Sequence, residues 1–69
     1  MFKKYLNQQL HKRDWTQREL SEKMGVHESL VSRWMKGERM PTLPNIIKLA
    51  TLFETSVEEI LGAMGKLDV

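Results

Sequence analysis

The 69-residue chain has no cysteine, only two prolines, and no apolar run near the roughly 20 residues that a membrane-spanning helix requires. The lack of cysteine excludes disulfide bonds and thiolate-ligated metal sites. It suits a reducing compartment, and we expect the protein to be cytoplasmic. The basic, amphipathic start of the chain also lacks the apolar region of a signal peptide. The sequence therefore predicts a soluble protein that has no membrane partner.

Motifs that carry chemistry are equally scarce. The two histidines, His11 and His27, fall on different predicted helices, at no spacing typical of metal ligands. There is no glycine-rich phosphate loop, no nucleophile elbow and no carboxylate pair that a pocket could surround. A chain this short buries only roughly 60% of the surface that its unfolded form exposes, which leaves little room for a concave site. We therefore expect no enzyme: no catalytic residues, no metal site, no cofactor and no small-molecule ligand.

Charge is distributed unevenly along the chain. Residues 1–39 carry nine basic and five acidic side chains, whereas residues 40–69 carry two basic and four acidic ones. The first part is suited to contact with a polyanion and the second is not. Charge alone leaves another interpretation open, in which the imbalance only decorates a solvated surface.

Apolar residues recur at helical spacing throughout the chain, and no segment alternates like a half-buried strand. The sequence therefore predicts an all-α fold with five short helices in a single domain, residues 1–69. They are expected at about residues 2–12, 17–24 and 28–36, from just after Thr42 to about Phe53, and from Ser56 to about Gly62. For residues 63–69 a flexible tail and an extension of the last helix both remain open.

Capping residues delimit these helices. Thr16 and Glu19 form a T-x-x-E capping box, and Ser56 and Glu59 repeat the pattern before the fifth helix. Thr42 is a suitable N-cap for the fourth helix. That helix is apolar around most of its circumference, so we expect it to be the central core helix.

The second and third predicted helices are separated by a tight turn at Gly25, which is typical of a helix-turn-helix. In the third helix, Val31 and Trp34 are expected to point into the core, while Leu30 could pack inside or touch a thymine methyl group. The opposite face holds Glu28, Ser29, Ser32, Arg33 and Lys36. Such a face suits the DNA major groove, which is about 12 Å wide, but it also suits an ordinary solvated helix.

Three segments keep a fixed spacing along the chain: WTQRELSEKMGV, LVSRWMKGERMPTL and IIKLATLFETSVEEIL. Together they resemble the Cro/C1-type helix-turn-helix family of phage repressors and bacterial transcriptional regulators, over about residues 6–62. The resemblance implies a compact, five-helix, lambda-repressor-like DNA-binding domain that works as a homodimer on palindromic operators. Three positions depart from the family pattern. His27 stands where Ser or Thr commonly caps the third helix, Met35 where Glu is frequent, and Glu54 where Gly often ends the fourth helix.

The exposed face of the third helix supplies the candidates for reading bases. Arg33 can donate two hydrogen bonds to guanine, and Glu28 can accept from the amino group of cytosine. Ser29 and Ser32 can bond to a base edge or to a phosphate. The family's Gln at position 17 binds a phosphate, and a helix N-terminus favours an anion. The full set of phosphate candidates is Thr16, Gln17, His27, Lys36 and Arg39, with Lys12, Arg13 and Arg18 as weaker ones.

The sequence thus predicts a sequence-specific regulator of transcription that binds double-stranded DNA, most simply a phage or bacterial repressor. A two-fold interface is expected on the fifth helix, at Val57, Leu61 and Met64. Three alternatives stay open: an antitoxin of this fold, a restriction-modification controller, and a protein-interaction module that has lost DNA binding. Operator sequence, regulated gene and the choice between repression and activation are left undetermined.

Overall fold

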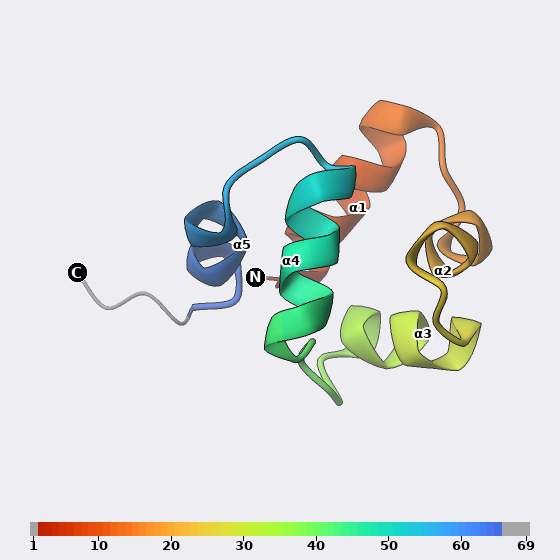
Figure 1. Cartoon of the computed structure of the whole chain (residues 1–69). Helices are drawn as coiled ribbons and strands as arrows, with labels where there is room; N and C mark the ends of the chain where they lie inside the picture. The colour runs from red at the N-terminus through yellow and green to blue at the C-terminus, as the bar shows by residue number, and fades with distance from the viewer. Residues whose placement is uncertain (1, 66–69) are drawn as a thin grey trace.

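The structure is a computed structural model that describes residues 2–65. It contains five helices, α1 (Phe2–Arg13), α2 (Gln17–Met24), α3 (Glu28–Lys36), α4 (Leu43–Leu52) and α5 (Val57–Ala63), and no strand within the described residues. In Figure 1, α4 stands in front of α1 with α5 on one side and α2 on the other, while α3 runs below them. The predicted all-α, five-helix fold is confirmed, and the predicted helix limits agree to within one or two residues.

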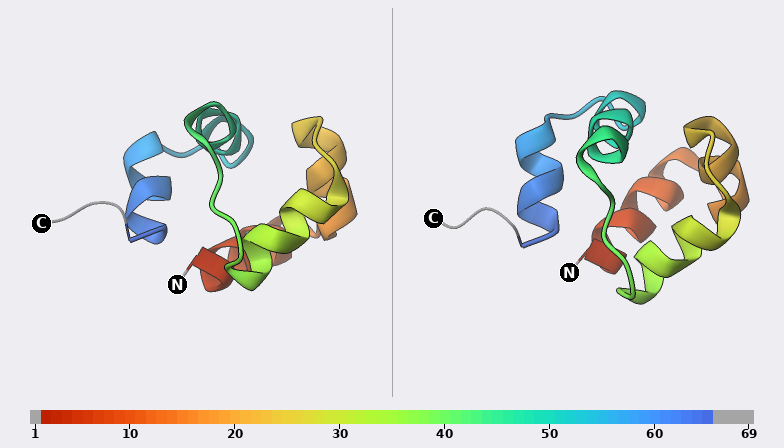
Figure 2. Two further views of the ribbon diagram at one scale, coloured as in Figure 1. Left: turned by 90° about the horizontal axis from the view of Figure 1, so that it is seen from below. Right: turned by 60° about the horizontal axis from the view of Figure 1, so that its bottom comes forward.

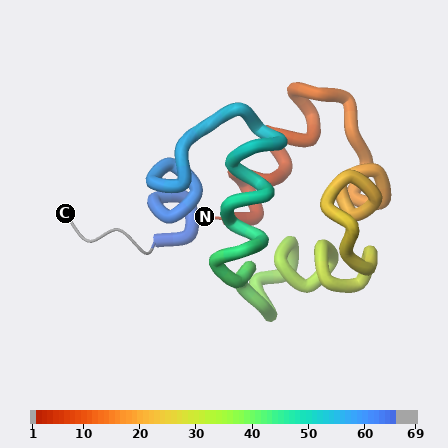
Figure 3. Tube along the Cα trace, in the orientation of Figure 1, coloured from red at the N-terminus to blue at the C-terminus, as the bar shows by residue number. Residues whose placement is uncertain are grey.

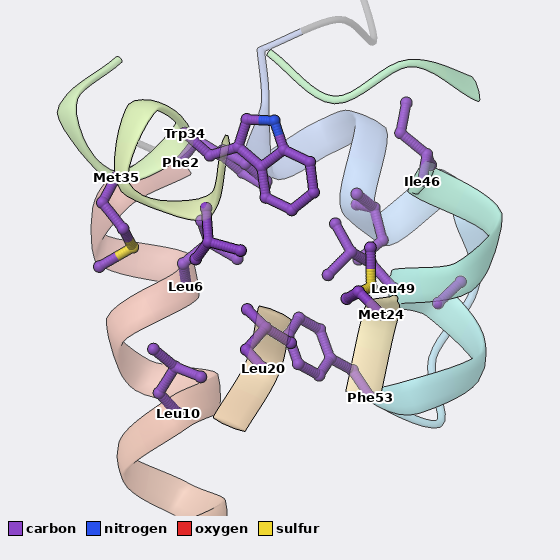
Figure 4. Close-up of a cluster of buried hydrophobic side chains, with 13 residues drawn as sticks. Phe2, Leu6, Leu10, Leu20, Met24, Trp34, Met35, Ile46, Leu49 and Phe53 are labelled. Carbon is purple, nitrogen blue, oxygen red and sulfur yellow. The ribbon is translucent and has the colours of Figure 1, made fainter. Parts of the chain in front are cut away.

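A single hydrophobic core joins the five helices. Its largest fully buried side chains come from every helix: Leu6, Leu20, Val31, Trp34, Leu49 and Ile60. Figure 4 shows Trp34, Leu20 and Phe53 directed toward a common centre. Burying one such side chain stabilises the fold by about 1.5–3 kcal/mol, so this cluster supplies most of the driving force in so small a domain. The predicted inward orientation of Val31 and Trp34 is confirmed, and it fixes which face α3 turns outward.

Backbone hydrogen bonds close the turn between α2 and α3, whose chain path can be followed in Figure 3. Gly25 adopts a φ of 70°, the left-handed conformation that glycine takes without a steric penalty, and its N–H donates to the carbonyl oxygen of Glu22. The N–H of Val26 donates to the carbonyl oxygen of Ser21 over 3.0 Å. The Lys48 ammonium group then donates to the carbonyl oxygen of Met24 over 3.2 Å, which ties the end of α2 to α4.

The predicted caps form to different extents. At α2 the capping box is complete: Thr16 Oγ1 accepts from the N–H of Glu19 over 3.0 Å, and Glu19 Oε1 accepts from the N–H of Thr16 over 2.9 Å. At α5 only half of the box forms, because Ser56 Oγ accepts from the N–H of Glu59 while the Glu59 carboxylate bonds elsewhere. Thr42 occupies the N-cap position of α4, but its side chain makes no capping hydrogen bond.

The helix that the sequence predicts as the central core helix, α4, leaves one of its faces exposed. Ile46, Leu49 and Ala50 are buried, but Leu43 and Ile47 remain 59% and 50% exposed. Because these two residues lie four apart, they share one side of the helix, and that side faces away from the core. At the other end of the chain, α5 ends at Ala63 rather than Gly62, and residues 66–69 lie outside the described residues.

Arg13 joins the ends of α1 and α4. Its Nη2 donates to the carbonyl oxygen of Phe53 over 2.6 Å, and its guanidinium group lies 5.1 Å from the centroid of the Phe53 ring. Its Nη1 donates to Gln9 Oε1 over 2.6 Å. The residue after Phe53 is Glu54, whose φ of 55° is the left-handed conformation that glycine commonly provides at a helix end. Arg13 is therefore a structural residue, and its weak candidacy as a phosphate ligand is not supported.

Candidate nucleic-acid interface

The outward face of α3 is open to solvent. Glu28, Ser29, Arg33 and Lys36 are exposed and Ser32 is half-buried, whereas Val31 and Trp34 on the opposite side are fully buried. In the left panel of Figure 2, which views the domain from below, α3 lies toward the viewer and crosses in front of α1. The structure thus brings the four residues predicted to read bases onto one helix face, with Glu28, Ser29 and Arg33 exposed and Ser32 partly accessible.

The core holds α3 rigidly in this orientation. Trp34 is 1% exposed, and α3 contacts both α1 and α2. The indole Nε1–H of Trp34 has no hydrogen-bond partner among the described residues, so the ring serves as an apolar anchor that carries one unsatisfied donor. A helix anchored on one face in this way presents its other face in a fixed register, as a reading helix requires.

His27 begins α3. Its φ of −69° and ψ of 142° are those of an N-cap, and its Nδ1 accepts a hydrogen bond from the backbone N–H of Ser29 over 3.2 Å. Nδ1 also lies 2.9 Å from the hydroxyl oxygen of Ser29. The imidazole therefore takes over the capping role that Ser or Thr has in the family pattern. Whether His27 also contacts a phosphate, as the sequence suggested, stays a prediction.

The N-terminus of α2 is already partly neutralised. The Glu19 carboxylate accepts from the N–H of Thr16, and this backbone hydrogen bond lowers the pKa of Glu19 from its usual value of 4.5. Thr16 Oγ1 in turn accepts from the N–H of Glu19, so it keeps only its hydroxyl hydrogen for an outside acceptor. Among the phosphate candidates at this helix end, half-buried Gln17 is the one whose side chain makes no recorded hydrogen bond within residues 2–65.

The cations beyond α3 are accessible. Lys36 ends the helix and Arg39 lies in the segment before Pro41, and both side chains are exposed. Within residues 2–65 the one ion pair is between Arg18 and Glu22, at 3.7 Å, with side chains 75% and 65% exposed. Lys36 and Arg39 thus remain available for an outside anion, whereas Arg18 is shared with an acidic neighbour and is the weaker candidate.

The residues predicted for a two-fold interface lie on α5 and just after it. Val57, Leu61 and Met64 are half-buried and pack against the core with part of their surface. The remaining part is free to contact a second molecule. Their role in a dimer therefore stays a prediction.

The structure also contains contacts that sequence reasoning missed. Ser21 is 4% exposed, and its hydroxyl donates to the carbonyl oxygen of Arg18 over 2.6 Å. The Tyr5 hydroxyl donates to Glu59 over 3.2 Å, which links α1 to α5. Burial, and next the charge of Glu59, raise the pKa of Tyr5 to about 12, so the phenol stays a donor at neutral pH. No spacing in the sequence signals the Tyr5–Glu59 contact, because it joins residues 54 positions apart, whereas the Ser21–Arg18 hydrogen bond is local, between residues three apart.

Two further features bear on function. Within residues 2–65 no group of three histidine, aspartate or glutamate side chains is close enough together to hold a metal ion. None of the helices in this part of the chain has both the length and the apolar character needed to cross a bilayer.

Comparisons with known proteins agree with this geometry. The model of the helix-turn-helix family matches residues 4–60. The chain is 30% identical over 47 residues to the cryptic phage CTXphi transcriptional repressor RstR of Vibrio cholerae, covering 68% of this chain and 42% of that protein. It is also 32% identical over 56 residues to the replication factor C small subunit of Methanocaldococcus jannaschii, covering 74% of this chain but 3% of that protein. The chain thus spans less than half the length of either relative, and no solved structure matches it. The family match covers most of the chain, and the chain belongs to the Cro/C1-type helix-turn-helix family of DNA-binding regulatory domains.

Proposed function

We propose that the protein is a sequence-specific transcriptional regulator that inserts α3 into the major groove of double-stranded DNA. The observation that carries this proposal is the two-sidedness of α3. Val31 and Trp34 are fully buried, while the opposite face exposes short polar and charged side chains. A major groove about 12 Å wide accepts one helix in this orientation. The excess of basic residues in the first part of the chain supports contact with a polyanion.

Each exposed side chain has a chemically defined role in this proposal. The guanidinium group of Arg33 donates two hydrogen bonds to O6 and N7 of guanine, and the Glu28 carboxylate accepts from the amino group of cytosine. Lys36 and Arg39 donate to phosphates at the end of α3, and Gln17 and Thr16 do so at the N-terminus of α2. Base contacts then define the sequence, and phosphate contacts define the position of the domain on the duplex.

We further propose a phage or bacterial repressor that acts as a homodimer on a palindromic operator. The named function of the RstR relative, a phage transcriptional repressor, supports this choice. The partly exposed Val57, Leu61 and Met64 supply an apolar strip for the two-fold contact. A cytoplasmic location goes with the proposal, because the regulator must reach its operator.

The decisive experiment selects bound duplexes from a random pool and then titrates the best duplex with salt. We expect a recovered half-site in inverted repeat, and a binding constant that falls steeply with salt, with a log–log slope of about −0.9 for each phosphate neutralised. An absence of salt-dependent duplex binding at about 50 mM salt contradicts the proposal and favours a protein-interaction module. An antitoxin or a restriction-modification controller of this fold would bind DNA in the same way, and the identity of the neighbouring genes distinguishes them.

A further inference from the structure

The start of α3 contains a hydrogen-bonding arrangement that limits what one of the base-reading candidates can recognise. His27 Nδ1 lies 3.2 Å from the backbone nitrogen of Ser29 and 2.9 Å from its hydroxyl oxygen. A backbone N–H can only donate, so Nδ1 must be the acceptor in the first contact. A neutral imidazole that accepts at Nδ1 carries its hydrogen on Nε2. The cap therefore selects one tautomer of the ring.

The tautomer determines the direction of the second hydrogen bond. Because Nδ1 carries no hydrogen, it cannot donate to the hydroxyl oxygen of Ser29. The 2.9 Å contact is then a hydrogen bond in which the Ser29 hydroxyl donates and Nδ1 accepts, sharing its lone pair with the backbone N–H. A serine hydroxyl has one hydrogen and two acceptor lone pairs. With the hydrogen committed to His27, the exposed Ser29 offers only lone pairs to a partner.

We propose that His27 is a specificity-determining residue, which makes Ser29 an obligate acceptor and so restricts it to the amino groups of adenine or cytosine. This inference depends on the proposed function, in which α3 lies in the major groove. There the donors on base edges are N6 of adenine and N4 of cytosine, whereas guanine, thymine and the phosphates offer acceptors to Ser29. The role of Ser29 is thus narrower than sequence alone allows, since a phosphate contact through its hydroxyl is excluded in this state.

The same arrangement makes the restriction reversible. A protonated imidazole carries hydrogen on both ring nitrogens, so Nδ1 no longer accepts from the N–H of Ser29 and can only donate to the hydroxyl oxygen. The Ser29 hydroxyl hydrogen is then released and can be donated to O6 or N7 of guanine or to O4 of thymine. Glu28, which directly follows His27, is the charged residue nearest to it in the sequence. Within residues 2–65 no ion pair or hydrogen bond links the imidazole to a charged side chain of α1, α2, α4 or α5.

The first part of the test needs no DNA. Nitrogen-15 NMR of the imidazole rings at pH 8 reports which nitrogen of each histidine carries the hydrogen. We expect the Nε2–H tautomer for His27, while exposed His11, for which no side-chain hydrogen bond is recorded, serves as the internal reference. An Nδ1–H tautomer at His27 overturns the inference whether or not the protein binds DNA.

The second part selects duplexes with the wild type and with His27→Ala, His27→Asn and Ser29→Ala at pH 8. We expect the wild type to prefer adenine or cytosine at one position of the half-site by about fivefold, the factor that one neutral hydrogen bond supplies. Ser29→Ala should abolish this preference. His27→Ala should relax it toward guanine and thymine, because the Ser29 hydroxyl is freed. His27→Asn is the matched control, since asparagine also caps helices through an acceptor oxygen and should keep both the helix start and the preference.

Repeating the selection at pH 5 distinguishes the contribution of His27 to the base preference from that of other residues, because histidine changes its charge between pH 5 and pH 8. The wild-type preference should weaken by about fivefold, and that of His27→Asn, which does not titrate, should stay unchanged. If His27→Ala keeps the wild-type preference, or Ser29→Ala does, the assignment is wrong. If the wild type selects no sequence at all, the proposed function fails and the base-reading role fails with it. The tautomer measurement still shows whether the cap itself was assigned correctly.

Discussion

Two arginines of this domain, Arg13 and Arg33, lie in different environments, one bonded within the protein and the other exposed. Arg13 donates from Nη1 to Gln9 and from Nη2 to Phe53, and its guanidinium group lies 5.1 Å from the centroid of the Phe53 ring. Arg33 is exposed on α3 and has no recorded partner among the described residues. Sequence distinguished the two arginines only through the helical phase of α3, which turns Arg33 away from Val31 and Trp34. The partner of Arg13 lies 40 residues away, and no local pattern indicates it.

Arg33 and Lys36 provide the sharpest comparison at the residue scale. Arg33→Ala should reduce discrimination at one base pair by roughly tenfold or more, because the bidentate contact to guanine is lost. Lys36→Ala should weaken binding to all sequences about equally and reduce the salt slope by about 0.9, since one phosphate contact is lost. Fluorescence-anisotropy titrations against the operator and a scrambled duplex measure both effects. Equal loss of specificity in the two variants would show that these roles are assigned wrongly.

We expect substitutions of Trp34 to change the stability of the folded domain. Trp34→Ala should lower the free energy of unfolding by about 3–5 kcal/mol, because it opens a cavity where a fully buried indole stood. Trp34→Phe is the matched control and should cost less. It keeps an aromatic ring and removes the indole N–H, which has no partner within residues 2–65. Urea denaturation followed by circular dichroism measures the difference. A Trp34→Ala variant with the parent's midpoint would mean that the ring is not interior in solution.

The structure also shows how two residues that depart from the family pattern, Met35 and Glu54, are accommodated. Met35 is 6% exposed and lies close to Phe2 and Leu6 in Figure 4, so an apolar side chain is compatible with a site where the family often has Glu. Glu54 adopts the left-handed conformation in place of glycine. Sequence indicated that both positions were unusual. It could not show how each is accommodated, because that depends on neighbours from α1 and on the hydrogen bond from Arg13.

At the scale of helices, one sequence pattern gives two outcomes. The T-x-x-E pattern at α2 forms a complete capping box, because the exposed Glu19 has no competing partner recorded among the described residues. The S-x-x-E pattern at α5 forms only half, because Glu59 instead accepts from the hydroxyls of Tyr5 and Thr55. Local sequence predicts that a helix begins at these points. Tertiary contacts then decide where the glutamate bonds.

The cap of α2 should be important for the stability of the helix-turn-helix. Thr16→Ala removes the acceptor for the N–H of Glu19 and should cost about 1 kcal/mol of unfolding free energy. Thr16→Ser is the matched control, since serine caps equally well, and it should be close to neutral. Thermal unfolding monitored at 222 nm compares the two variants. A loss of equal size in Thr16→Ser would assign the effect to the threonine methyl group and not to the cap.

The same helix start predicts a dependence on pH. The hydrogen bond from the N–H of Thr16 lowers the pKa of Glu19 in the folded state. The stabilisation is therefore fully present above the unfolded pKa of 4.5 and is lost as the pH falls through the lower folded value. The difference in stability between the wild type and Glu19→Gln should be largest near pH 7 and should shrink toward pH 3. A difference that stays constant across this range would show that the charge of Glu19 is not involved.

For the molecule as a whole, sequence predicted the number of helices and their limits well, because caps and glycine turns are local signals. It identified α4 as the central core helix from its apolar circumference, and it gave no sign that Leu43 and Ile47 are exposed. The pattern of an almost entirely apolar helix does not say which faces its neighbours cover. Here α2 and α5 lie on two sides of α4 and leave a third side open, an arrangement that only the three-dimensional structure reveals (Figure 1).

The last prediction concerns the geometry of a dimer, in which two domains bind one palindromic duplex. If α5 forms the two-fold contact, the two copies of α3 should lie about 34–36 Å apart, which is one turn of the duplex. Inserting about 5 base pairs between the half-sites turns one of them to the opposite face of the DNA, because a turn contains about 10–10.5 base pairs. Binding should then weaken to that of a duplex with a single half-site, which is the control.

Val57→Lys should have the same effect on the intact operator, since it puts a charge on the proposed contact while Val57 is only half-buried in the core. Sedimentation of the protein–DNA complexes distinguishes one bound copy from two. A single bound copy on the intact operator, with affinity indifferent to the insertion, would establish that the domain reads DNA as a monomer.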